Sequence, residues 1–130
     1  MNVNHLISDT IARIKNGFVG HKNTVSVLKS KQTSRIIEIL EQEGFIRGYL
    51  DNKNTITVQL KYLDGKSVIH NFKVISTPGE RMYFGFKDLI DWKNETNSFE
   101  MLILSTTQGI FADHVVLEKG LGGEVLCIIK

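Results

Sequence analysis

Two apolar runs in the last quarter of the chain place the strongest limits on its fold. Residues 99–104 and 125–129 each have the length and composition of one buried strand. The first run leads into a hydroxyl cluster and a glycine, namely Ser105, Thr106, Thr107, Gln108 and Gly109. The second run follows a glycine-rich segment, namely Gly120, Leu121, Gly122, Gly123 and Glu124. Strands of this kind would hold hydroxyls and backbone groups rigidly, which suits a polar partner recognised by shape and hydrogen bonds.

The chain is long enough for one domain or for two small lobes that share an interface. It has 130 residues, of which 42% are hydrophobic and 23% charged, as in an ordinary soluble globular protein. The single cysteine, Cys127, excludes an internal disulfide framework and a cysteine-based zinc site. The four histidines are scattered without ligand spacing, so we predict no metal and no other cofactor.

The sequence predicts neither a membrane segment nor a cleaved leader. No run approaches the ~18 consecutive apolar residues of a membrane span. The N-terminus lacks a basic region followed by an apolar one. With its lone cysteine in an apolar run, the chain is expected in a reducing compartment, without a membrane partner.

Charge is divided unevenly along the chain. Residues 1–75 carry 11 basic and 6 acidic side chains, whereas residues 76–130 carry 5 basic and 8 acidic ones. No acidic residue occurs between Arg13 and Arg35, although four lysines lie there: Lys15, Lys22, Lys29 and Lys31. This stretch is compatible with a positive face toward phosphates and equally with a solvated surface of scattered lysines.

The first part of the chain predicts an α/β lobe. Apolar residues recur at helical spacing up to residue 18, and Gly17 is a plausible helix end. After a short strand at residues 25–28, a second helix is expected to begin at Ser30 or Ser34 and to end at Gly44. Three strands should then follow as an antiparallel meander, at residues 45–50, 55–60 and 67–75.

The only proline, Pro78, marks the predicted passage into a second lobe. Beyond it we predict four further elements: a strand at residues 81–84, a helix at 86–92, a polar loop at 94–97 and a helix at 113–119. The fold class is therefore α+β, with an α/β lobe over residues 1–75 and a mostly antiparallel β lobe with short helices over residues 76–130.

Several segments carry a resemblance to a known family when they are taken together and in this order. They are residues 13–17 (Arg-Ile-Lys-Asn-Gly), 43–46 (Glu-Gly-Phe-Ile), 60–62 (Leu-Lys-Tyr) and 76–81 (Ser-Thr-Pro-Gly-Glu-Arg), with the hydroxyl cluster and the Gly-Gly-Glu segment. Over essentially its whole length the chain resembles the bacterial and organellar type of small-subunit ribosomal protein eight. The resemblance implies a two-lobed protein that binds a helical region in the central domain of small-subunit ribosomal RNA early in assembly.

The resemblance also implies which residues contact RNA. In the family the hydroxyl loop enters the minor groove of an irregular stem, which assigns this role to Ser105, Thr106, Thr107 and Gly109, with Gly122, Gly123 and Glu124 beside them. Further candidate contacts are Arg13, Asn16, Lys29, Lys31, Arg81 and Tyr83. The alternative is that the hydroxyl cluster merely turns the chain and caps a short helix.

The chain departs from the family pattern at three positions. Thr77 stands where the family usually has Arg, and Gln108 stands where it often has Lys, so two cations are lost. Ala112 replaces a hydroxyl helix cap, which leaves Asp113 to cap the following helix. Recognition should therefore rest more on shape and hydrogen bonds than on phosphate attraction.

Other functional classes fit less well. Ser105, Asp113 and His114 lack the Gly-X-Ser-X-Gly motif, and the glycine segment lacks the Lys-Ser/Thr of a phosphate loop, so we predict neither an enzyme nor a small-molecule substrate. A protein-interaction scaffold without RNA is the alternative. We predict a structural constituent of the small ribosomal subunit, with ribosomal RNA and neighbouring ribosomal proteins as partners. Abundant Asn, Lys and Ile favour a mitochondrial ribosome, with the bacterial cytoplasm as the alternative.

Overall fold

The computed structural model describes residues 3–95 and 99–130, which form two compact units, Met1–His70 and Asn71–Lys130. The α+β class predicted from the sequence is confirmed. The division comes earlier than the predicted boundary after residue 75. It does so because β6 (Phe72–Val74) pairs with β10 (Gly123–Ile129) and therefore belongs to the second unit.

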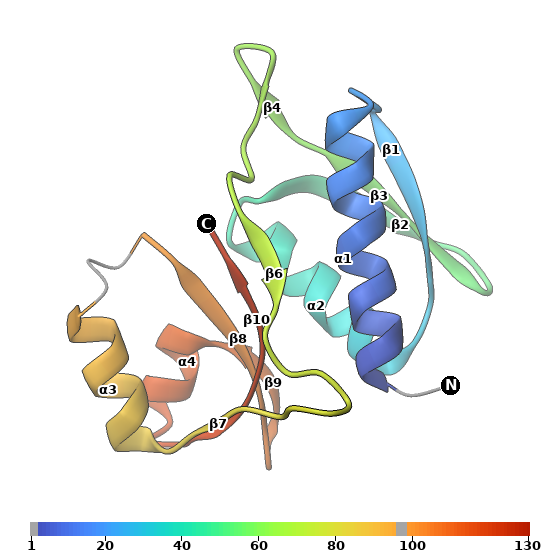
Figure 1. Cartoon of the computed structure of the whole chain (residues 1–130). Coiled ribbons are helices and arrows are strands. Elements are labelled where there is room, and N and C mark those ends of the chain that lie inside the picture. Colours follow the sequence, from blue (N-terminus) through green and yellow to red (C-terminus); the bar gives the residue numbers. More distant parts are fainter. Residues whose placement is uncertain (1–2, 96–98) are drawn as a thin grey trace. The chain divides into compact units, whose positions relative to one another are not determined.

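The first unit contains a three-stranded antiparallel sheet with two helices. The strand order is β1–β3–β2, and α1 lies along β1 while α2 packs on β2 (Figure 1). The elements are α1 (Val3–Val19), β1 (Thr24–Leu28), α2 (Lys31–Gln42), β2 (Ile46–Asp51) and β3 (Thr55–Leu60). Alternate residues of β3 are buried, as expected for strands with one face on a core.

Local signals define α2. The Ser30 side chain accepts a hydrogen bond from the Thr33 N–H, and the Thr33 hydroxyl accepts one from the Ser30 N–H, which forms a capping box. The helix buries Ile36 and Leu40, and the chain leaves it through Gly44 at φ +81°. Of the two predicted starts, Ser30 and Ser34, the structure has Ser30, and the predicted end at Gly44 is confirmed.

Gly17 does not end α1, which continues to Val19. A Cβ at residue 17 would overlap the side chain of Val25 and lie 2.9 Å from Leu60 Cδ1. The glycine therefore permits close packing of the helix on the sheet, and this contact gave no local signal in the sequence.

The prediction of a third meander strand at residues 67–75 is wrong. Residues 66–67 form β5 (Lys66–Ser67), which pairs with β4 (Tyr62–Leu63) in a small hairpin. Residues 72–74 form β6, whose partner is β10. The apolar pattern of residues 67–75 indicated the strand at residues 72–74 correctly, but it contains no information on the partner strand.

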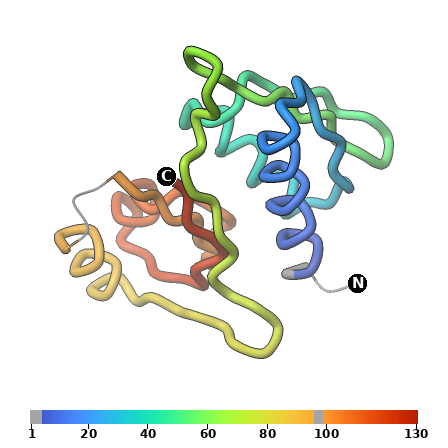
Figure 2. The backbone as a smooth tube through the Cα atoms, turned by 45° about the horizontal axis from the view of Figure 1, so that its top comes forward, coloured from blue at the N-terminus to red at the C-terminus, as the bar shows by residue number. Residues whose placement is uncertain are grey.

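The second unit is built around β10, which pairs with β6, β7 and β8, while β8 also pairs with β9. After β6 the chain makes a wide loop before it returns through β7 (Figure 2). The remaining elements are β7 (Tyr83–Phe84), α3 (Phe86–Glu95), β8 (Met101–Thr106), β9 (Gly109–Ala112) and α4 (Asp113–Glu118). Of the helices that the structure describes, none is long and apolar enough to cross a membrane.

Several elements of the second unit have other bounds than the sequence predicted. The strand predicted at residues 81–84 shortens to β7, and the helix predicted at 86–92 extends to Glu95. Residues 94–95 of the predicted polar loop thus form the C-terminal end of α3, and residues 96–97 lie outside the described part of the chain. The helix predicted at residues 113–119 is confirmed as α4, which ends one residue earlier, with Gly120 at φ +67° beyond its end.

Asp113 is fully buried, and its carboxylate links three elements. Its Oδ2 accepts a hydrogen bond from the Leu102 N–H at 3.0 Å and lies 3.1 Å from Lys93 Nζ. The cap position of α4 is Ala112, which provides no side-chain hydrogen bond. The prediction that Asp113 caps α4 is therefore wrong, because its side chain points to β8 and α3 instead.

Cys127 lies in the middle of β10 and is completely buried. Burial raises the pKa of its thiol to about 12, since the thiolate would lose its hydration. The side chain is therefore a protonated core residue, as its apolar sequence context indicates.

Candidate nucleic-acid interface

Three neighbouring strands bring Tyr83, Glu124 and Ser105 into one row. Glu124 of β10 pairs with Tyr83 of β7 on one side and with Ser105 of β8 on the other. Directly opposed residues of an antiparallel sheet project from the same face, so a phenol ring, a carboxylate and a hydroxyl lie side by side. Tyr83 is 64% exposed. This recognition row joins residues that are far apart in the sequence.

Arg81 lies beside the recognition row. Its Nη1 is 3.3 Å from Glu124 Oε2, and 42% of the Arg81 side chain is exposed, against 13% of the Glu124 side chain. Such a half-exposed pair adds little to stability. It holds the guanidinium at the edge of the row and balances the carboxylate charge there.

The hydroxyl cluster forms the tip of the β8–β9 hairpin. Thr106 pairs with Gly109, and its Oγ1 donates a hydrogen bond to the Gly109 carbonyl at 2.7 Å and accepts one from the Gln108 N–H at 3.1 Å. Gly109 has φ +130°, which a side chain would strain. Both hydrogen bonds of the Thr106 hydroxyl lie within the hairpin turn. For Thr106, therefore, the contacts agree with the alternative hypothesis that the hydroxyl cluster turns the chain.

Ser105 and Thr107 differ from Thr106. Ser105 is half-buried at the end of β8, and Thr107 is exposed at the hairpin tip. Within residues 3–95 and 99–130, no hydrogen bond to another residue was found for either hydroxyl. Both can therefore donate to and accept from an external partner.

Gly122 and Gly123 let β10 approach its neighbours closely. A Cβ at Gly122 would lie 2.5 Å from the Phe84 carbonyl oxygen, and a Cβ at Gly123 would overlap the Ser105 carbonyl. These contacts give the two glycines a packing role, because they set the spacing at which Tyr83, Glu124 and Ser105 align.

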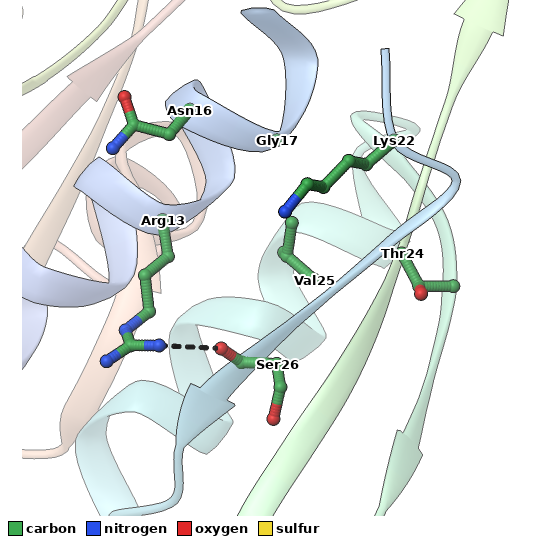
Figure 3. A pocket seen from close by; sticks show the side chains of 7 residues that line it. All are labelled: Arg13, Asn16, Gly17, Lys22, Thr24, Val25 and Ser26. Atoms are coloured by element: carbon green, nitrogen blue, oxygen red, sulfur yellow. Dashed lines mark hydrogen bonds between the residues drawn. The ribbon is translucent and has the colours of Figure 1, made fainter. Parts of the chain in front are cut away.

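In the first unit, Arg13 and Asn16 of α1 line a hollow against β1. Its volume is about 310 Å³, and the remaining lining residues are Gly17, Lys22, Thr24, Val25 and Ser26. The Lys22 side chain reaches back across the hollow toward α1, and Arg13 extends to the Ser26 carbonyl, with Nη1 at 3.5 Å (Figure 3). Two cations, one on α1 and one in the connection between α1 and β1, therefore face one space.

The two cations of the α1–β1 hollow are not equivalent. Arg13 Nε lies 2.9 Å from Asp9 Oδ2, so an i,i+4 ion pair offsets part of its charge. For Lys22 no ion pair was found in the described part of the chain. Lys22 was missed as a candidate because the sequence showed it only as one lysine of a basic stretch.

Lys29 and Lys31 lie outside this hollow. Lys29 Nζ is 3.2 Å from Asp51 Oδ1 and donates to the Asn52 carbonyl at 3.2 Å, at the turn between β2 and β3. Lys31 is exposed at the first position of α2. The basic stretch is thus divided between two places, and the charge of Lys29 is already paired.

Comparison with known proteins identifies close relatives in bacteria. The small ribosomal subunit protein uS8 of Rhizobium rhizogenes is 37% identical over 134 residues, which covers 99% of both chains. The protein of the same name from Sinorhizobium medicae is 38% identical over 128 residues, which covers 95% of both. These relatives do not support the mitochondrial ribosome that the composition favoured.

A family model supports the same relationship. The model described as Ribosomal protein S8 matches residues 5–129, which span nearly all of both units and include every candidate residue above. The match agrees with the six segments from which the sequence predicted this family. The chain belongs to the ribosomal protein S8 family.

Proposed function

We propose that this ribosomal protein binds an irregular stem in the central domain of small-subunit ribosomal RNA and thereby supports subunit assembly. The observation that carries the proposal is the alignment of Tyr83, Glu124 and Ser105 on one sheet face, beside a hairpin tip with an uncommitted hydroxyl. The role is structural and requires no catalytic step.

The recognition row suits the minor groove of RNA. That groove is wide and shallow and displays 2′-hydroxyls and base edges, which the hydroxyls of Ser105 and Thr107 can meet as donors or acceptors. The carboxylate of Glu124 accepts from base amino groups, and the exposed ring of Tyr83 can stack on a base displaced from an irregular stem. An irregular stem is needed because a regular duplex keeps its bases stacked.

Substitutions at the hairpin tip test this assignment. Thr107→Ala should lower the affinity for the irregular stem by about 1–3 kcal/mol, because RNA groups lose a partner in the interface. Its melting temperature should not change, since Thr107 is exposed and no hydrogen bond of its hydroxyl was found in the described residues. Thr106→Ala should lower both affinity and melting temperature, because the Thr106 hydroxyl closes the turn.

Titration with an irregular stem and with a regular duplex, alongside thermal melting, distinguishes the two effects. The loss caused by Thr107→Ala should be confined to the irregular stem. Equal losses on both RNAs, together with early melting of the Thr107 variant, would assign the whole cluster to the turn.

The α1–β1 hollow supports a second, electrostatic contact. Arg13 and Lys22 present two cations to a space of about 310 Å³, which suits a backbone phosphate. Lysine neutralises phosphate without reading a base, so this contact would add affinity for any RNA of suitable shape.

Salt dependence measures this contribution. With about 3 phosphate contacts in all, the slope of log affinity against log salt should be roughly −2 to −3. Lys22→Gln should flatten the slope by about 0.7–0.9, whereas Lys53→Gln in the β2–β3 turn should leave it unchanged. A double Lys29→Gln and Lys31→Gln variant tests the two other lysine candidates, and it should weaken binding to any RNA and flatten the slope. Unchanged affinity and slope would assign both lysines to solvent. A wild-type slope near −8 would show that charge dominates recognition.

The bacterial relatives favour a bacterial ribosome as the site of action. Sedimentation of the source cell's ribosomes, with detection of this chain in the fractions, tests the proposal directly. After the ribosomes are dissociated into subunits, the chain should co-sediment with the small subunit and be absent from the large subunit.

A further inference from the structure

We propose that a groove between β7 and α3 docks a cationic segment of a neighbouring protein. The groove has a volume of about 410 Å³ and is lined by Tyr83, Phe84, Asp88, Asp91, Trp92 and Glu95. Strand β7 leads directly into α3 at the edge of the second unit (Figure 1). This β7–α3 groove goes beyond the proposed RNA contact, with which it shares only Tyr83 at the boundary.

Helical spacing places four of the lining residues on one face of α3. They stand at positions i, i+3, i+4 and i+7 and therefore form one stripe along the helix: Asp88, Asp91, Trp92 and Glu95. The facing wall is β7, which contributes Tyr83. The groove therefore combines a helix face that carries carboxylates with a strand that carries an aromatic ring.

Aromatic side chains line part of the groove. Phe84 and Trp92 are half-buried and pack against the apolar core cluster of the second unit, which fixes their position. Tyr83 is 64% exposed, and its neighbours Met82 and Phe86 are 44% and 43% exposed. This apolar surface beside the groove would be covered by a bound partner.

The charge of the groove is negative and largely uncompensated. Among the residues that the structure describes, its lining has three carboxylates and no cation. Asp88 Oδ2 accepts a hydrogen bond from the Gly85 N–H at 2.9 Å, and no ion pair of Asp91 or Glu95 was found in the described residues. Lys93 Nζ lies 5.8 Å from the centre of the Trp92 ring, but it is paired with the buried Asp113.

Charge complementarity selects a cationic protein segment as the occupant. Carboxylates beside aromatic rings bind guanidinium groups through ion pairs and cation–π contacts. The same carboxylates repel the phosphates of RNA, and residues 76–130 as a whole carry 8 acidic and 5 basic side chains. Arginine is the better match because its planar group can stack on Trp92 while its N–H groups reach Asp91 and Glu95.

Trp92 is the only tryptophan of the chain, so its fluorescence reports on the groove directly. The probe is a blocked peptide of alternating glycine and arginine, and the control peptide carries neutral citrulline at each arginine. Titration of the whole protein with the arginine peptide should give a saturable change of Trp92 emission. The citrulline peptide should bind at least tenfold more weakly.

Matched variants test the carboxylates. Asp91→Asn with Glu95→Gln should weaken binding of the arginine peptide at least tenfold, whereas Glu80→Gln with Glu118→Gln should not change it. Both double variants remove two exposed acidic charges from the second unit, so their effect on net charge is the same. Circular dichroism establishes that both are folded.

Three results would overturn the docking proposal. They are unchanged Trp92 emission, equal binding of both peptides, and equal effects of the two double variants. The RNA titration is a separate arm: the Asp91 and Glu95 variant should bind the irregular stem with wild-type affinity. Parallel loss of RNA and peptide binding would assign the groove to the RNA surface, whereas failure of RNA binding in every variant would count only against the RNA proposal.

Discussion

Asp113→Ala is expected to lower the free energy of unfolding by about 3–5 kcal/mol, which corresponds to a fall of roughly 10–20 °C in melting temperature. The Asp113 carboxylate is completely buried between β8 and α3. Its removal leaves the Leu102 N–H without an acceptor and the Lys93 ammonium, 22% exposed, without its counter-charge. Urea unfolding followed by circular dichroism measures the loss.

Further variants separate the hydrogen bond from the ion pair. Asp113→Asn retains an oxygen for the Leu102 N–H, so its cost should stay below about 2 kcal/mol. Lys93→Met should cost as much as Asp113→Ala, because it leaves a buried carboxylate unpaired. Combining Lys93→Met with Asp113→Asn should recover most of that loss. If Asp113→Ala cost no more than a substitution of the exposed Asp64, the buried pair would contribute nothing to stability.

Gly123→Ala is expected to reduce affinity for the irregular stem at least roughly tenfold, or about 1.4 kcal/mol. The new Cβ would overlap the Ser105 carbonyl and lie 3.2 Å from Thr106 Cγ2, so β8 must move away from β10 at the recognition row. Overpacking of this kind costs about 1–3 kcal/mol of folding stability as well. RNA titration and urea unfolding of the same preparation measure both effects.

Gly79→Ala is the matched control for this substitution. A Cβ at Gly79 meets nothing within 4 Å, so both affinity and stability should stay at the wild-type values. If Gly123→Ala lost stability but kept full affinity for the stem, the spacing of β8 and β10 would have no part in RNA recognition.

Elements with local signals were predicted well from the sequence. The second helix begins after Ser30 and ends before Gly44 because a hydroxyl cap and a left-handed glycine act on the nearest backbone groups. The helix that follows Ala112 ends before Gly120 for the same reason. Signals of this kind depend on a few adjacent residues and therefore need no knowledge of the fold.

Long-range pairing was not predictable in the same way. Residues 72–74 have the composition of a strand, but their partner β10 lies about fifty residues later, and nothing local distinguishes it from β3. Gly17 is a similar case, because a glycine near a helix end indicates termination until the contact with Val25 is known. Partner choice depends on the whole core, which a local pattern does not describe.

In the candidate site, too, the residue types could be predicted from the sequence but their arrangement could not. The family resemblance picked out Ser105 and Glu124, and Tyr83 was a separate candidate contact, but only the strand register aligns the three. The turn-forming role of Thr106 and the position of Lys22 opposite Arg13 also depend on the folded chain. Residue types therefore indicated the chemistry of the site, and tertiary structure determines which groups act together.

The central position of β10 has a consequence for the order of events during synthesis. This strand comes after β6, β7 and β8 in the chain, yet it is the partner of all three. While residues 123–129 are still inside the translating ribosome, β6 and β7 have no partner, and Tyr83 has no neighbour to align it with Ser105. A nascent or truncated chain therefore lacks the recognition row, so under the proposed RNA contact only molecules whose synthesis has passed this strand can compete for ribosomal RNA.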